Sequence, residues 1–551
     1  MNAGGNKQYD GWTTVALLLT GGYLFMVVWP LITVLFSSVT DEAGFSLDGF
    51  STFFSSRLYY GTLLNSLVVT VCVTVLAFVI AFPLAYFMTM FQVRGNRIIQ
   101  ILILASMMSP PFIGAYSWIL LLGNNGLITR WLQSTLGLES PSIYGFAGIV
   151  LVLTLQLVPL IFTYLMGAWR TIDVALLEAA ESMGITGWRR AAKVIMPLLL
   201  PTVLGGSLLV FVRAFADFGT PMLIGQGFRT IPVLIYSSFV GEVSIDRSFA
   251  SAVAVIVIAV TLAVFLIQKY IVDRRTFSMT AMRPIEPKRL PGWRGVLIHG
   301  YVYGFLVLAL APLIVVVVSS FLNTLYGQFV DGFSFRNYIT AQRDIFRYIS
   351  NTFSIGITAL VLLVMVAVLV SYLTVRRKNA LTGLLDTMTM IPYVVPGLVI
   401  GIALITAYSQ PPLVLTGSFA IMVLALAIRR LPYTVRSTTA LMYQFSPSIE
   451  EAAVSLGASK TRTLIQIVVP ALAPGILAGA VLSWVTIITE LSTTLFLYNT
   501  STQTLALGIY AQVIRGQLGT AAALSTILLV LTMLSLLLLM RMSGGNREVR
   551  I

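Results

Sequence analysis

Residues 178–184 read EAAESMG, and Pro197 follows their final glycine at a distance of 13 residues. Residues 451–457 read EAAVSLG, and Pro470 again follows the glycine at 13 residues. The chain on either side of each copy is strongly apolar, so each copy is a polar loop of fixed design in a hydrophobic protein. A loop of one design that occurs twice predicts two equivalent docking sites for a partner.

The composition is that of a protein with many membrane spans. Of the 551 residues, 58% are hydrophobic and 10% are charged, and the mean hydropathy is +0.93. Soluble domains are not built in this way. A spanning helix needs about 20 apolar residues, and a helix satisfies its own backbone in lipid. The sequence therefore predicts an all-α polytopic membrane protein, in which prolines such as Pro396 produce kinks. The twelve expected spans are 13–38, 63–90, 98–122, 146–169, 194–212, 250–271, 296–321, 351–375, 383–408, 415–436, 467–489 and 519–541.

The net charge of +14 is distributed asymmetrically. Alternate loops on one side carry 25 of the 34 lysines and arginines, whereas the 20 acidic residues divide equally between the sides. This positive-inside pattern predicts that both termini and both repeated loops are cytoplasmic. It also argues against a nucleic-acid partner, because the positive charge follows membrane topology. The first apolar run is too long for the core of a cleavable signal peptide.

Few residues are suited to catalysis or metal binding. Cys72 is the only cysteine, so no internal disulfide can form, and His299 is the only histidine, so a histidine-rich metal site is impossible. With few acidic residues in the spans, no general acid–base set or metal site assembles. We therefore expect neither a membrane-embedded enzyme nor a metal centre.

An internal repeat divides the chain into two halves of six spans each. The N-terminal half, a polar cytoplasmic linker and the C-terminal half cover 1–272, 273–295 and 296–551. In the first part of each half, corresponding residues such as Asn65 and Asn351 are 286 apart, and in the later part they are 273 apart, as are Glu178 and Glu451. Because both repeated loops are expected on the same side, the halves are parallel repeats around a shared path.

Each repeated loop is expected to form a helix, a sharp turn and a second helix. In the first copy Asp173 is the expected N-cap. In the second copy Ser448 begins a Ser-x-x-Glu capping box, and Ser446 is a competing cap one step earlier. Gly184 and Gly457 stand where the end of a helix requires a left-handed residue.

The two loops, about 170–197 and about 444–470, resemble the EAA loops of permeases of type I binding-protein-dependent ABC importers, and the resemblance extends over nearly the whole chain. It implies a fused permease in the bacterial inner membrane, with about twelve helices in two parallel six-helix repeats. It also implies two copies of a separate ATPase subunit, which carry Mg-ATP, and a periplasmic or extracellular substrate-binding protein. By this resemblance the residues that couple to the ATPase are Glu178, Ala179, Ala180, Gly184, Glu451, Ala452, Ala453 and Gly457. The chain has no Gly-x-x-x-x-Gly-Lys-Ser/Thr phosphate loop of its own, so no catalytic site or cofactor is expected within it.

Asp217 and Glu490, which correspond between the halves, are the candidate charges of the transport path. Each follows the fifth span of its half, at the end expected to be external. They could face each other and bind a cationic cargo, or each could cap a helix or pair with an arginine such as Arg213. Arg213 has no counterpart, because Thr486 stands at its position, and it is a weaker candidate, for an anionic cargo.

The segment 216–225, ADFGTPMLIG, looks most like ferric-iron permeases, which makes ferric iron the favoured cargo. Phosphorylated sugars, phosphonates and thiamine are the alternatives, because similar fused permeases serve them. A twelve-span secondary transporter is the alternative from another class. It would need coupling charges at mid-span, and it gives no reason for the two repeated loops.

Overall fold

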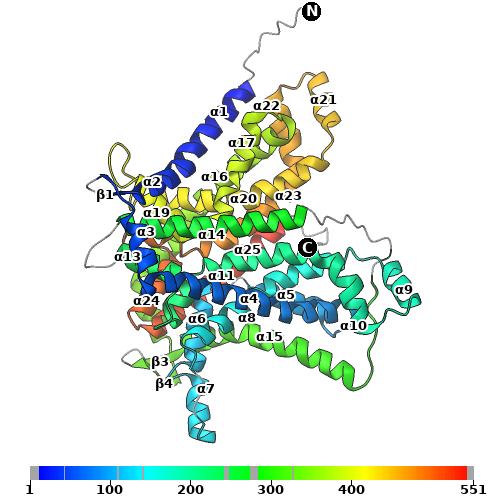
Figure 1. Ribbon diagram of the computed structural model, residues 1–551, viewed down its shortest axis with the longest axis vertical. Coiled ribbons are helices and arrows are strands. Elements are labelled where there is room, and N and C mark those ends of the chain that lie inside the picture. Colours follow the sequence, from blue (N-terminus) through cyan, green and yellow to red (C-terminus); the bar gives the residue numbers. More distant parts are fainter. Residues whose placement is uncertain are drawn as a thin grey trace, which may run out of the picture. The chain divides into compact units, whose positions relative to one another are not determined.

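Helices form nearly all of the regular structure (Figure 1), as the composition predicts. The computed structural model describes residues 11–41, 44–107, 111–138, 142–240, 247–273, 283, 285–325 and 328–542. The strands within these residues form two antiparallel hairpins: β1 (Thr40–Asp41) with β2 (Gly44–Phe45), and β3 (Leu322–Leu325) with β4 (Gln328–Phe333).

The helices gather into two compact units. Unit 1 contains 1–47, 342–508 and 527–549, and unit 2 contains 48–341 and 509–526. The helices of unit 1 are α1 (Gly11–Tyr23), η1 (Leu24–Val28), α2 (Trp29–Ser37), most of α16 (Arg336–Arg376), α17 (Ala380–Thr389), α18 (Ile391–Val394), α19 (Gly397–Ala407), α20 (Phe419–Gln444), α21 (Pro447–Ser455), α22 (Lys460–Thr463), η4 (Leu464–Val468), α23 (Val469–Ile488) and η5 (Thr494–Phe496). The helices of unit 2 are α3 (Asp48–Ser55), α4 (Arg57–Met90), α5 (Asn96–Ser106), α6 (Pro111–Leu122), α7 (Leu127–Trp131), η2 (Leu132–Leu136), α8 (Phe146–Trp169), α9 (Val174–Ser182), α10 (Gly187–Arg190), η3 (Ala191–Ile195), α11 (Met196–Phe215), α12 (Gly219–Ile224), α13 (Ile231–Val240), α14 (Arg247–Asp273) and α15 (Trp293–Ser320). Residues of α24 (Leu505–Ile514) and α25 (Leu518–Met542) belong to both units.

Among the described residues, nine helices are long and apolar enough to cross a membrane, or ten if the bent pair α17–α18 with α19 counts as one span. Each of the twelve predicted segments corresponds to helix, but two do not pass this test. The predicted span 98–122 is divided between α5 and α6. The predicted span 415–436 lies in α20, where every window of 18 residues contains Arg429, Arg430 and Arg436.

The span predicted at 383–408 is broken and not merely kinked. The helices before and after Val395 and Pro396 are bent by 112°. Val395 adopts an extended conformation, with φ −76° and ψ 126°. A residue that precedes proline is pushed out of the helical region by a clash with the proline ring. The predicted counterpart of Pro396 in the first half, Pro110, lies outside the described residues.

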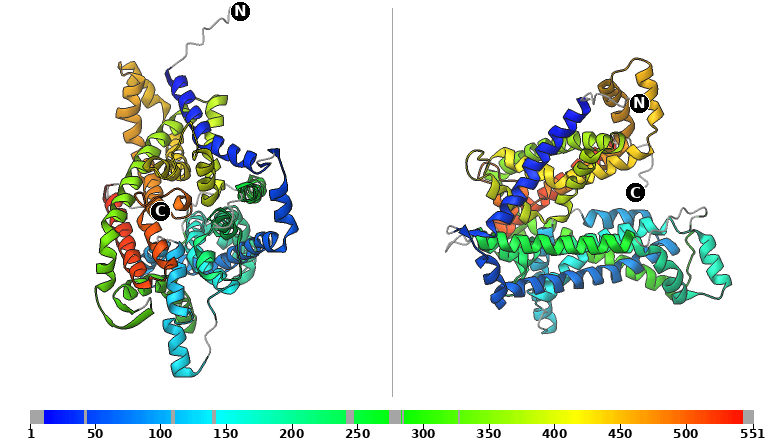
Figure 2. Two further views of the ribbon diagram at one scale, coloured as in Figure 1. Left: turned by 90° about the vertical axis from the view of Figure 1, so that its left-hand side faces the viewer. Right: turned by 45° about the horizontal axis from the view of Figure 1, so that its top comes forward.

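The first helix of each sequence half packs against helices of the other half. In unit 1, α1 and α2 lie against α17 and α19 (Figures 1 and 2). The ring centroid of Trp12 in α1 also lies 4.9 Å from that of Tyr372 in α16. In unit 2, α15 packs on α4, α5 and α6, and the Tyr301 hydroxyl donates to the Ile80 carbonyl at 2.8 Å. The predicted halves are therefore repeats in sequence, whereas each packing unit combines helices from both.

One packed helix pair occupies an equivalent place in the sequence of each unit. In unit 2, α8 packs on α4 and α11, and in unit 1, α20 packs on α23. The α20–α23 approach is close, because a Cβ on Gly479 would lie only 2.6 Å from the Cα of Thr434. The repeated loops connect these packed helices: α9 and α10 join α8 to α11, and α21 and α22 join α20 to α23.

Candidate functional site

The two repeated loops fold into the predicted helix, turn and second helix, and each forms a hairpin at one end of its unit (Figure 1). The α9 helix begins at the predicted cap, since the Asp173 carboxylate accepts from the backbone N–H of Ala175 at 2.9 Å. In the second copy the prediction of Ser448 as the cap is wrong. Ser446 is the N-cap and Pro447 is the first helical residue, the position at which proline has no N–H to lose.

Both loop helices end in the same hydrogen-bonded turn. Gly184 has φ +73° and Gly457 has φ +90°, the left-handed conformation that glycine adopts without a clash. In the first loop the Ile185 N–H donates to the Ala180 carbonyl at 2.8 Å, and in the second the corresponding bond joins residues 458 and 453 at 3.1 Å. These are the contacts of a Schellman motif. The identical glycine positions in the sequence therefore produce identical turns.

The exposed faces of the two loop helices also correspond. Glu178, Ala179, Glu451 and Ala452 are exposed. The second alanine of each loop is buried beneath its own turn, with Ala180 at 1% and Ala453 at 8% exposure. The first glutamate and first alanine are thus available to a partner, whereas the second alanine supports the turn.

One feature of these loops was not predicted from the sequence. The residue before each glycine is large, apolar and exposed: Met183 is 70% exposed and Leu456 is 89% exposed. The repetition of this exposed apolar side chain at the same turn position makes it a candidate contact residue in both loops. The available signal was an apolar residue at a turn that is otherwise polar, present in both copies.

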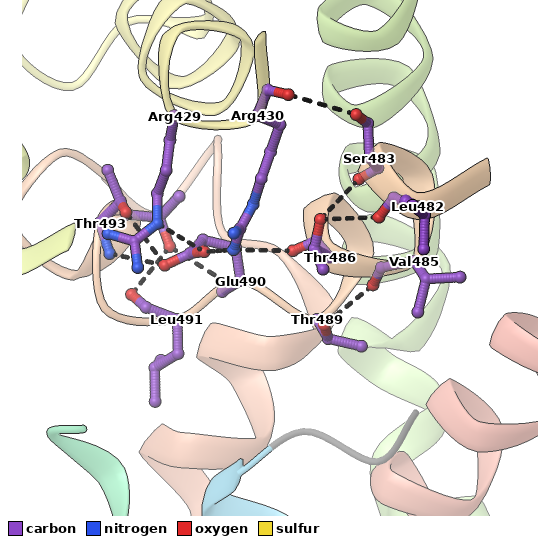
Figure 3. Close-up of polar contacts among 11 residues, drawn as sticks. Arg429, Arg430, Leu482, Ser483, Val485, Thr486, Thr489, Glu490, Leu491 and Thr493 are labelled. Atoms are coloured by element: carbon purple, nitrogen blue, oxygen red, sulfur yellow. Dashed lines mark hydrogen bonds and ion pairs between the residues drawn. The ribbon is translucent and has the colours of Figure 1, made fainter. Parts of the chain in front are cut away.

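Glu490 lies in a buried cluster of charges in unit 1 (Figure 3). Its side chain is 4% exposed and contacts two guanidinium groups, those of Arg430 and Arg429, the second through Nε at 3.3 Å. Its carboxylate also accepts from the backbone N–H and the hydroxyl of Thr493, both at 3.0 Å. Arg430 additionally donates to the carbonyl of Thr486 at 3.3 Å. Glu490 therefore joins α20 to the segment that follows α23.

Arg429 and Arg430 lie near the middle of α20, within the predicted span 415–436. Glu490, predicted at the external end of its own span, therefore contacts charges on a neighbouring predicted span, and its side of the membrane stays a prediction. Two adjacent arginines within a predicted span were the signal for this site, because charges there are expensive unless paired.

Asp217 occupies the corresponding position in unit 2, but its contacts differ. Its carboxylate accepts from the backbone N–H of Thr220, in the first turn of the short helix α12, at 2.8 Å. Gln156 and Leu157 stand where the second half has its two arginines. Arg213 is half-exposed on α11. The two candidate acids lie in different units, and whether they face each other stays a prediction.

The described residues combine nine or ten candidate spans with two hairpins of equivalent design, the organisation of a membrane protein built from two homologous halves. Comparison with known proteins identifies the family. Residues 79–277 and 364–543 each match the family described as the inner membrane component of binding-protein-dependent transport systems. These matches cover more than half of the chain, and the chain belongs to that family. It is a multi-pass membrane protein and the permease subunit of an ABC importer.

Similar permeases from other bacteria support the organisation of this chain in two halves. The ferric transport system permease protein FbpB of Actinobacillus pleuropneumoniae is 26% identical over 95% of this chain and 77% of its own length. The Fe(3+)-transport system permease protein FbpB 2 of Haemophilus influenzae is 23% identical over 74% of this chain and 78% of its own. PhnU of Salmonella typhimurium, a permease named for 2-aminoethylphosphonate transport, is 26% identical over 48% of this chain and 92% of its own. The family assignment decides against the secondary transporter.

Proposed function

We propose that this permease couples ATP hydrolysis by separate ATPase subunits to the import of ferric iron. One observation supports the coupling above all: the two loops have helix caps, turns and exposed residues at corresponding positions, although they lie 273 residues apart. Two identical hairpins suit two copies of one partner. In this proposal both hairpins and both termini are cytoplasmic, and an external binding protein delivers the cargo.

The docking would use the apolar residue at each turn together with the glutamate beside it. Met183 and Leu456 would enter an apolar pocket on the ATPase subunit, and Glu178 and Glu451 would pair with basic groups at its rim. An apolar anchor surrounded by polar contacts is the usual arrangement of an interface hot spot. ATP-driven closure of the ATPase dimer would then move both hairpins together and change the access of the path.

Substituting the turn residues tests the docking. We expect Met183→Glu with Leu456→Glu to reduce co-purification of the ATPase subunit by about 30-fold or more, because each buried anchor contributes roughly 2 kcal/mol or more. Both side chains are exposed, so the permease should fold normally. Leu482 is also an exposed leucine, but Leu482→Glu would not serve as a control because this residue lies within a candidate membrane span. The matched control is Met183→Leu with Leu456→Met, which keeps an apolar side chain at each turn and should retain the ATPase. Normal co-purification by the glutamate variant would contradict the docking.

The cargo assignment rests on relatives named for ferric transport that align along most of the chain. We expect cells that depend on this system to accumulate labelled ferric iron, and excess 2-aminoethylphosphonate to leave that uptake unchanged. The binding protein encoded with the permease should bind ferric ion in preference to phosphonates and sugar phosphates. Uptake of labelled 2-aminoethylphosphonate without uptake of iron would overturn the iron assignment and leave the coupling proposal intact.

A further inference from the structure

The two docking helices are held to their units by different contacts. In unit 1, the last residue of α16 is bound to the first turn of α21. Arg376 Nε lies 2.7 Å from Glu450 Oε1, and the same guanidinium donates to the Phe445 carbonyl at 2.6 Å. The Arg376 and Glu450 side chains are each 14% exposed, and a pair so well shielded is not weakened by solvent as a surface pair is. Movement of α21 is therefore transmitted to the 41-residue helix α16.

The first docking helix has no equivalent ion pair at these two positions. Met90 stands where the second half has Arg376, and Leu177 stands where it has Glu450. Neither side chain carries a charge. Instead, the polar segment that joins the two halves contacts α9. The Val174 N–H donates to the Arg283 carbonyl at 3.1 Å, and the Arg283 N–H donates to Asp173 Oδ2 at 3.3 Å.

The same segment is bound to the end of α4. The Lys288 N–H donates to the Met90 carbonyl at 2.9 Å, and the Gln92 N–H donates to the Lys288 carbonyl at 3.0 Å. Arg289 Nε donates to Gln92 Oε1 at 2.9 Å. A few residues later the chain enters α15 at Trp293. The described residues 283 and 285–292, which we call the linker strap, thus contact the N-terminus of α9 and the end of α4 and lead into α15.

We propose that the linker strap positions the first docking helix, as the Arg376–Glu450 pair positions the second. This proposal rests on the proposed coupling to an ATPase. In this proposal the linker between the two halves does more than join them, because it also positions the helix of one docking site. It also makes the two docking sites unequal, because each is held by contacts that the other lacks, so each can be uncoupled separately.

Lengthening the strap tests the proposal in the full permease, assembled with its ATPase subunits and binding protein in proteoliposomes. Insertion of Gly-Gly-Ser between Glu286 and Pro287 separates the α9 contact from the α4 contact. We expect it to lower transport per ATP hydrolysed by roughly threefold to tenfold, the range expected from loss of one or two hydrogen bonds. The same insertion before Arg283 lengthens the connection equally but leaves every strap contact in place, and it should behave as the unmodified protein.

Two point substitutions, made in separate variants, provide a second test that does not alter the chain length. Asp173→Ser retains a helix cap, as Ser446 does at the corresponding position, but removes the oxygen that accepts from Arg283. It should also lower transport per ATP hydrolysed, whereas the reverse change, Ser446→Asp, should have no effect because no strap contacts α21 among the residues that the structure describes. The proposal is overturned if both insertions impair coupling equally, or if the strap insertion and Asp173→Ser leave it unchanged. Failure of the unmodified permease to retain any ATPase would refute the proposed function, and co-purification measures this separately.

Discussion

Reversing the exposed glutamate of both docking helices, with Glu178→Arg and Glu451→Arg together, is expected to reduce transport by about 100-fold or more. In the proposed interface each glutamate pairs with a basic group of an ATPase subunit. Reversal replaces two attractions with two repulsions, and juxtaposed like charges at an interface are unfavourable by several kcal/mol. Both side chains are exposed, so the substitutions do not bury a charge. The measurement is uptake by cells, with membrane abundance of the permease determined in parallel.

The control variant is Asp41→Arg, which reverses an exposed acidic residue in β1, outside both docking helices and outside the linker strap. It changes the net charge in the same direction and should leave transport near its normal level. Each single reversal should be less severe than the pair, because one ATPase contact remains. Undiminished uptake by the double variant, at normal abundance, would show that these glutamates do not dock an ATPase.

Local features of the docking loops could be predicted from the sequence because short-range chemistry determines them. A carboxylate at Asp173 caps the helix that follows, and a glycine at position 184 or 457 adopts the left-handed turn. Each rule needs only a few neighbouring residues. The repeat then strengthened each prediction, because two independent segments had to satisfy the same geometry. The error at Ser448 has the same origin, since two serines separated only by Pro447 both offered a cap.

Contacts between distant segments could not be predicted in this way. Glu490 meets Arg429 and Arg430 across about 60 positions of sequence, and nothing local to any of them fixes the pairing. The packing of α1 and α15 against helices of the opposite sequence half is equally non-local. The break at Val395 and Pro396 was only partly predicted. The proline indicated a kink, but not the 112° bend between helices that pack against α20 and η5.

The exposed apolar turn residues show a different limit of prediction from the sequence. Met183 and Leu456 differ in identity, so a comparison of identical letters between the copies passes over them. Their shared property is exposure, 70% and 89%, and exposure depends on the fold of the whole hairpin. A pattern search based on chemical class at each aligned position would have found them.

The second large effect is expected at Glu490. Glu490→Gln preserves the shape of the side chain but leaves the guanidinium groups of Arg429 and Arg430 beside each other without a carboxylate. Removing one partner from a buried ion pair typically destabilises a protein by about 3–5 kcal/mol, because the remaining charge is buried and uncompensated. We expect the variant to unfold at a markedly lower temperature or denaturant concentration in detergent, and to be less abundant in membranes.

Asp217→Asn is the matched comparison, because Asp217 is the counterpart of Glu490 in the first half. Asparagine can still accept from the Thr220 N–H, so the loss should be about 1 kcal/mol or less. Combining Glu490→Gln with Arg430→Gln should recover part of the stability, because it removes one of the uncompensated charges. Equal destabilisation by Glu490→Gln and Asp217→Asn would show that the arginine contacts contribute little. A folded Glu490→Gln permease that fails only in uptake would instead place this carboxylate in the transport path, where it must release its arginines to meet a cationic cargo.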